Sequence, residues 1–169
     1  MADPDAIVID GRGLYEAELG HFKGGVCPAI NSFREFPGWF RERAGEWKGK
    51  KLLTYCTGGI RCEKLSGFLR REGFDRVYQL EGGIVSYGRD PEVRGRDFEG
   101  LCYVFDERIG VEVNHTETRR ILSHCRHCGA EEARYGNCRL PECNAQIFVC
   151  PECREGFGLY CGESCRERK

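Results

Sequence analysis

Short apolar runs alternate with amphipathic segments over the first half of the chain. The runs at residues 6–9, 51–55 and 76–80 have the length and composition of buried strands. Amphipathic segments at 14–19, 32–44 and 60–72 predict helices between them, with Pro37 and Gly38 expected to interrupt or restart the second. Strands that alternate with helices in this way predict a small α/β domain, in which helices flank a parallel sheet.

The second half of the chain loses this periodicity. Residues 98–113 hold two apolar runs that flank Asp106, Glu107 and Arg108, a pattern that favours a β-hairpin or an extended connector. From His124 onward, cysteines dominate. We therefore expect an α/β domain at 1–92, a hairpin or connector at 93–123 and a small cysteine-rich module at 124–169.

Composition and charge are those of an ordinary globular protein. Of 169 residues, 40% are hydrophobic and 31% charged, and the net charge of −1 argues against a general attraction to nucleic acid or anionic membranes. The first residues lack the pattern of a signal peptide, and no run of apolar residues is long enough to span a bilayer. We expect a cytoplasmic protein that does not associate with membranes.

The twelve cysteines are unevenly distributed. Four lie in the first 114 residues and eight in the last 45. A disulfide framework is one interpretation of this density, but without a signal peptide, closely spaced cysteine pairs more often bind metal. Cys27 and Cys102 lie in apolar surroundings, and we expect them only to fill space.

The eight C-terminal cysteines form four pairs, which is enough for two closed sites of four thiolates each. They are Cys125 and Cys128, Cys138 and Cys143, Cys150 and Cys153, and Cys161 and Cys165. Such sites typically hold structural zinc, and this module has too few large apolar residues to fold without metal. Neighbouring pairs can share an ion, or the first can join the third and the second the fourth. The shared CxxC form of the first and third pairs favours the second arrangement. His124 and His127 are not needed as ligands.

The segment YCTGGIRCEK, residues 55–64, has the layout of a strand, a tight turn and a helix start. This layout aims backbone N–H groups at one point, and there the thiol of Cys56 is expected to become a thiolate. We expect the N–H groups of residues 57–61 to surround it and Arg61 to fix the loop. The residues predicted to bind substrate are Thr57, Gly58, Gly59 and Ile60. A buried cysteine at a strand end is the alternative interpretation of Cys56.

Two further observations bear on this loop. The spacing from Cys56 to Arg61 is C-x4-R, one residue shorter than the phosphatase loop, so it suits a sulfur atom or a small oxyanion better than a phosphoryl group. Cys62, Leu65 and Leu69 form one stripe of the predicted helix, which favours packing for Cys62 over the alternative role of a resolving thiol.

Several of these segments together resemble a rhodanese domain over about residues 5–90. They are Asp10-Gly-Arg12, Tyr15-Glu16, Gly20-His21, Gly24-Gly25, the loop from Cys56 to Arg61, and Glu81-Gly82-Gly83. The resemblance implies an α/β sulfurtransferase-like fold in which Cys56 carries a persulfide. By the same resemblance, Asp10 and Arg12 brace the site.

The segments CTGGIRCEK, LEGGIVSYG and CYVFDER, followed by the cysteine-rich tail, are similar more narrowly to the bacterial tRNA uridine hydroxylases. This resemblance implies hydroxylation of the wobble uridine at carbon 5 with molecular oxygen as co-substrate, tRNA as partner and an essential loop cysteine. The sequence has no flavin or nicotinamide motif, and zinc has no redox role. It also has no counterpart of the family's N-terminal acylphosphatase-like domain. We interpret the chain as a truncated or split protein, or as one with a narrower function. A separate chain that supplies the missing domain is a further alternative.

Two other functions remain as alternatives. A plain sulfurtransferase would move sulfane sulfur through a Cys56 persulfide. A zinc-stabilised interaction module with an idle α/β domain would need neither Cys56 nor Arg61, so the presence of both speaks against it.

Overall fold

The first of two compact units in the chain contains a three-stranded parallel sheet. The computed structural model describes residues 3–106, 110–118 and 120–168, and the units span 1–120 and 121–169. The sheet has the strand order β1 (Ala6–Asp10), β3 (Lys51–Tyr55) and β4 (Val77–Gln79). Its register pairs Ile9 with Thr54 and Leu52 with Val77, so the predicted strands are confirmed.

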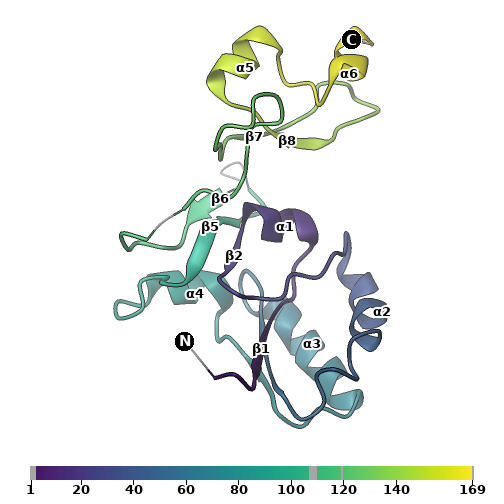
Figure 1. Ribbon diagram of the computed structural model, residues 1–169, viewed down its shortest axis with the longest axis vertical. Coiled ribbons are helices and arrows are strands. Elements are labelled where there is room, and N and C mark those ends of the chain that lie inside the picture. Colours follow the sequence, from purple (N-terminus) through teal and green to yellow (C-terminus); the bar gives the residue numbers. More distant parts are fainter. Residues whose placement is uncertain (1–2, 107–109, 119, 169) are drawn as a thin grey trace. The chain divides into compact units, whose positions relative to one another are not determined.

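Helices α2 (Phe36–Arg41) and α3 (Ile60–Arg71) lie on the same side of β1 (Figure 1). They bury a shared cluster of large apolar side chains against the sheet: Ile9, Phe36, Phe40, Leu52, Leu65, Leu69 and Val77. A short 3-10 helix, η1 (Phe33–Glu35), precedes α2, and Pro37 lies in the first turn of α2, where its missing N–H costs nothing. The predicted interruption therefore falls just before Pro37, and the predicted α/β architecture is confirmed.

A second, antiparallel sheet belongs to the same unit. It has the order β2 (Gly20–Phe22), β5 (Phe98–Tyr103) and β6 (Gly110–Glu112), with α1 (Leu14–Leu19) leading directly into β2. Strands β5 and β6 form the predicted hairpin. Of the predicted polar residues between them, Asp106 is described, while Glu107 and Arg108 lie outside the described residues. Helix α4 (Gly83–Arg89) packs Ile84 into a second buried cluster. This cluster also contains Phe22 of β2, Phe98 of β5 and Tyr55 of β3.

One part of the parallel sheet remains open to solvent. A hollow of about 750 Å³ is lined by Ala6, Val8, Leu53 and Tyr78, beside the residues where β1 and β3 begin. The hollow lies on one face of the sheet, because its lining residues Val8, Leu53 and Tyr78 are paired across the middle of the three strands. The thiol loop, residues 56–61, begins after the last residue of β3 and does not line this hollow. None of the helices in the described ranges has the length and apolar character that crossing a bilayer requires.

The second unit is built around a two-stranded hairpin. Strand β7 (Tyr135–Asn137) pairs antiparallel with β8 (Gln146–Phe148), and two short helices follow, α5 (Pro151–Gly156) and α6 (Glu163–Glu167). Its buried residues form two small clusters, each of which contains cysteines, rather than one apolar core. This organisation fits a fold that depends on bound metal.

Candidate active site and metal centres

The thiol loop occupies the carboxyl end of β3. Cys56 directly follows the strand and is 1% exposed, and α3 begins four residues later at Ile60. Gly59 caps α3 in the left-handed region at φ 88°, a conformation that glycine adopts without strain. This turn brings the N–H of Gly59 to 3.1 Å from the Cys56 sulfur. The loop therefore holds the sulfur at the amino end of a helix.

These surroundings favour the thiolate of Cys56. A hydrogen bond from the Cys62 thiol is the largest influence that lowers the pKa of Cys56, which falls from 9.0 to about 5. Backbone N–H groups of Cys62, Arg61 and Gly59 add to this effect, while burial opposes it. The same hydrogen bond, together with burial, raises the pKa of Cys62. The proton of the pair therefore stays on Cys62, and the negative charge stays on Cys56.

The loop is supported from behind by the start of α4. The N–H groups of Ile84 and Val85 donate to the carbonyl oxygens of Cys56 and Thr57, at 3.0 and 3.1 Å. Gly83 has a φ of +65°, and a Cβ there would lie 2.5 Å from the Cys56 carbonyl oxygen. Only glycine allows this close approach, which explains the Gly82-Gly83 pair in physical terms.

Arg61 is held by a carboxylate from α1. Its two terminal nitrogens donate to the two oxygens of Glu16, at 2.6 and 2.9 Å, and one of them also lies 3.3 Å from the Thr57 hydroxyl. Glu16 is 1% exposed, and it also accepts the N–H of Gly13. This two-pronged ion pair fixes the guanidinium plane at the edge of the loop.

Asp10 and Arg12 form a second, completely buried ion pair behind the loop. Arg12 donates to Asp10 at 2.7 Å and to the carbonyl oxygen of Gly20 at 2.6 Å, and both side chains are 0% exposed. The Arg12 guanidinium lies 5.7 Å from the ring centre of Tyr55, the residue before Cys56. The pair links β1, β2 and β3 without reaching solvent, which is the geometry of a brace.

Two thiols that the sequence assigned to simple packing, the buried Cys102 and the half-buried Cys27, lie near this pair. Burial raises the pKa of Cys102 to about 11, and the charge of Arg12 and a hydrogen bond with Thr57 oppose the shift. Burial likewise raises the pKa of Cys27 to about 11. Both thiols therefore stay protonated at neutral pH. Their surroundings, which the sequence predicts to be apolar, include the charged side chains of Asp10 and Arg12.

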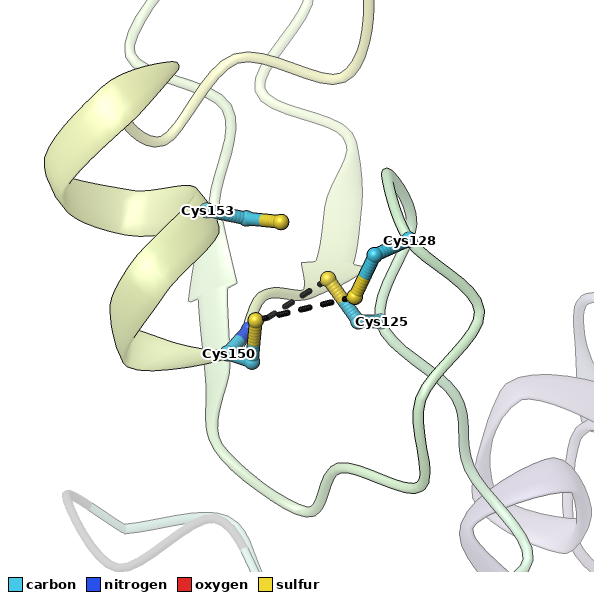
Figure 2. A group of neighbouring side chains, drawn as sticks. All are labelled: Cys125, Cys128, Cys150 and Cys153. Atoms are coloured by element: carbon cyan, nitrogen blue, oxygen red, sulfur yellow. Dashed lines mark hydrogen bonds between the residues drawn. The ribbon is translucent and has the colours of Figure 1, made fainter.

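The second unit brings its eight cysteines into two groups of four. The first group contains Cys125, Cys128, Cys150 and Cys153, drawn in Figure 2, and the second contains Cys138, Cys143, Cys161 and Cys165. Within each group all sulfurs lie within 4.8 Å of one another. Each group can therefore hold a metal ion, and the crossed arrangement of pairs is confirmed.

The hairpin explains why the pairs cross. Cys138 directly follows β7 and Cys150 closely follows β8, and antiparallel strands carry their following residues to opposite ends of the hairpin. Cys125 lies at the same end of the hairpin as Cys150. The backbone N–H of Cys150 donates to the sulfur of Cys125 at 3.4 Å (Figure 2). Cys143, in the loop between the strands, stays with Cys138.

The sulfur separations fit a tetrahedral metal ion. Two sulfurs that each lie about 2.3 Å from such an ion are about 3.8 Å apart. The separation of Cys128 from Cys150 is 3.7 Å, and those of Cys161 from Cys143 and Cys165 are 3.5 and 3.4 Å. Four thiolates leave no position for water, so an ion bound here would be structural.

Comparison with known proteins agrees with this geometry. The rhodanese-like domain family matches residues 1–90, and the family described as Rhodanase C-terminal matches residues 99–166. The chain belongs to the rhodanese-like family. The thiol loop and the cysteine-rich unit thus each lie in a region matched by its own family.

Close relatives of this rhodanese-like chain are named tRNA uridine(34) hydroxylase. That of Bacillus velezensis is 51% identical over 166 residues, which cover 98% of this chain and 51% of the relative. The relative from Bacillus cereus strain G9842 is 52% identical over 166 residues, which cover 98% of this chain and 52% of the relative. The chain therefore spans about half the length of the curated relatives it matches. A solution structure of a rhodanese-like domain from Anabaena is 19% identical, with a TM-score of 0.45 over 68% of this chain and 85% of that one.

Sequence reasoning about this rhodanese-like domain found the loop but missed two contributors. Cys62 packs with Leu65 and Leu69 as predicted, yet its thiol and its N–H also reach Cys56. Glu16, the partner of Arg61, received no role. Its position after β1 was a usable signal, because the segments that follow parallel strands meet at one edge of a sheet. The substrate-binding role of Thr57, Gly58 and Ile60 stays a prediction.

Replacing Glu16 by Gln in the rhodanese-like domain is expected to lower the free energy of unfolding by about 1.5–3 kcal/mol, because Arg61 loses its charged acceptor in a largely buried site. Urea unfolding measures the change. The matched control is Glu42→Gln, whose pair with Arg43 is 73% and 38% exposed on the two side chains and contributes at most about 1 kcal/mol. Equal losses in the two variants would contradict the assignment of Glu16 as a buried anchor.

Proposed function

We propose that this protein takes part in tRNA modification as a cytoplasmic enzyme that hydroxylates the wobble uridine at carbon 5. Molecular oxygen is the co-substrate: one oxygen atom goes to carbon 5, and an external two-electron reductant, with two protons, converts the other to water. The partner is tRNA. Cys56 is the reactive thiol, and Arg61 fixes the loop around it. Asp10 and Arg12 act as positioning residues, since both are buried and separated from solvent.

One observation carries this proposal. A thiol held as thiolate in the thiol loop occurs in a chain about half identical, over 98% of its length, to proteins named tRNA uridine(34) hydroxylase. A low pKa gives Cys56 the nucleophilic form at neutral pH, and neither a packing role nor an interaction role requires that form. The interaction-module alternative accounts for none of these features.

Sulfur transfer is a second candidate, favoured by the N–H groups that converge on the Cys56 sulfur. Such donors stabilise the anionic terminal sulfur of a persulfide as well as they stabilise a thiolate. Intact-mass measurement after thiosulfate treatment tests this candidate, because sulfur transfer adds one sulfur atom to the wild type and none to Cys56→Ser.

Comparison of wobble nucleosides tests hydroxylation. We expect cells without the gene to lose 5-hydroxyuridine in tRNA, the wild-type gene to restore it, and Cys56→Ser to restore none. Cys27→Ser, which alters a protonated thiol outside the loop, serves as the matched control and should restore it. Equal 5-hydroxyuridine with and without the gene would overturn the proposed function.

We also propose that both four-cysteine groups bind zinc. Four thiolates at tetrahedral spacing suit this ion, which supplies structural cross-links and no redox chemistry. The residues of the first group and those of the second hold one ion each, on opposite ends of the β7–β8 hairpin.

A further inference from the structure

Only three large apolar side chains are exposed in the described part of the chain. Two of these three belong to the thiol loop or contact it. Ile60 is 79% exposed at the start of α3, and Phe105 is 69% exposed after β5. The third, Tyr78, is 54% exposed and lines the hollow on the face of the parallel sheet, which the thiol loop does not line. Exposed aromatic rings next to a reactive group are candidates for ligand contact.

Phe105 is held in place by other aromatic rings. Its ring packs edge-to-face against Tyr103, with centroids 5.1 Å apart and planes at 76°. Tyr103 in turn packs edge-to-face against Tyr15 of α1, at 5.3 Å and 89°. This chain of rings reaches the helix that carries Glu16, so the position of Phe105 is tied to the frame of the site.

The exposed ring also lies beside the guanidinium that borders the loop. Arg61 is 5.9 Å from the ring centre of Phe105, and its ion pair with Glu16 fixes its plane. The outer side of the loop is open, because a Cβ on Gly58 would meet no atom within 4 Å. The loop therefore presents no steric obstacle at Gly58, and the guanidinium of Arg61 connects its edge to the exposed Phe105 ring.

We propose that Phe105, supported by Tyr103 and flanked by Arg61, is the stacking platform for the uracil base presented to the thiol loop. This inference rests on the proposed function. Proteins that act on unpaired bases commonly stack them on aromatic rings and guanidinium planes. The wobble base lies in a single-stranded loop, where it is already free to leave its neighbours. Phe105 therefore recognises the base itself, while contacts elsewhere on the RNA are independent of it.

The binding of two RNA hairpins to the intact protein tests the platform. One is an anticodon stem-loop with uridine at the wobble position, and the other is identical but abasic at that position. Phe105→Ala should weaken binding of the uridine hairpin by about 5- to 150-fold, the range that loss of one stacked base produces, and leave the abasic hairpin unchanged. Phe105→Trp should retain uridine binding, whereas Phe105→Leu, which keeps apolar bulk without a ring, should lose it. Tyr78→Ala is the matched control and should change neither.

Each outcome decides the proposal. A similar loss for both hairpins, no loss for either, or a wild type that does not distinguish them would overturn the platform. Alkylation of Cys56 in each variant verifies that the loop remains intact. The nucleoside comparison separates this inference from the proposed function. Production of 5-hydroxyuridine without Phe105-dependent binding refutes only the platform. Phe105-dependent binding without 5-hydroxyuridine refutes only the hydroxylation.

Discussion

Alkylation of Cys56 by iodoacetamide is expected to reach half its maximal rate at about pH 5 and to stay constant from about pH 6 upward. The thiolate is the reacting form, and the loop lowers the pKa of Cys56 to about 5, so the charged form predominates above that pH. An ordinary cysteine becomes mostly thiolate only above about pH 8.5. Peptide mass spectrometry across a pH series measures the rate at this residue alone. A half-maximal rate near pH 8.5 would contradict the activated thiol.

Variants of Cys62 separate the two sources of this effect. Cys62→Ala removes the largest hydrogen bond that stabilises the thiolate, so the midpoint should move upward while remaining below the ordinary value, because the backbone N–H groups still contribute. Cys62→Ser keeps a hydrogen-bond donor, so this variant should shift the midpoint less than Cys62→Ala does. Cys27→Ala, which removes a half-buried thiol outside the loop, should leave the midpoint in place. The same midpoint in Cys62→Ala and the wild type would assign the whole effect to the backbone.

Removal of the metal proposed for the two four-cysteine groups is expected to unfold the second unit, at residues 121–169. Apparent binding free energies of zinc in small cysteine-rich folds are about 10–16 kcal/mol, more than a unit with two small buried clusters can replace. Hydrogen exchange before and after chelation measures the change, and amides of β7 and β8 should lose their protection while those of β1, β3 and β4 keep theirs. Protection of β7 and β8 that persists without metal would refute a metal-dependent fold.

Metal analysis of single variants provides the matched test. The wild type should contain two ions per chain, one for each group of four cysteines. Cys153→Ser, in the first group, and Cys165→Ser, in the second, should each lower the content by one ion. Cys102→Ser, which alters a buried cysteine outside both groups, should leave it unchanged.

Local pattern was enough to predict the parallel sheet and its largest helix. Strands at 6–9, 51–55 and 76–80 correspond to β1, β3 and β4, because short apolar runs between amphipathic segments have few other solutions. The stripe of Cys62, Leu65 and Leu69 likewise gave the buried face of α3 correctly. Cysteine spacing favoured the correct grouping, although the antiparallel hairpin that enforces it was not foreseen.

The elements that the sequence did not reveal depend on distant contacts. Strand β2 has three residues, too few for a visible alternation, and exists because Gly20 pairs with Gly100 of β5. Helix α4 begins with the left-handed residue Gly83 and contains Gly88, so its composition predicts a turn. Glu16 is acidic and looked suited to solvent, but Arg61, forty-five positions away, makes its burial favourable.

The pairing of β5 with β2 affects where this protein can be divided. A cut between the two regions matched by family comparison, at residues 91–98, would leave the thiol-bearing fragment without the strand next to β2 and without Cys102 in its core. The severed edge would expose unpaired backbone groups, which invites aggregation. A fragment intended for recombinant expression should therefore extend to about residue 120, well beyond the limit that homology alone suggests.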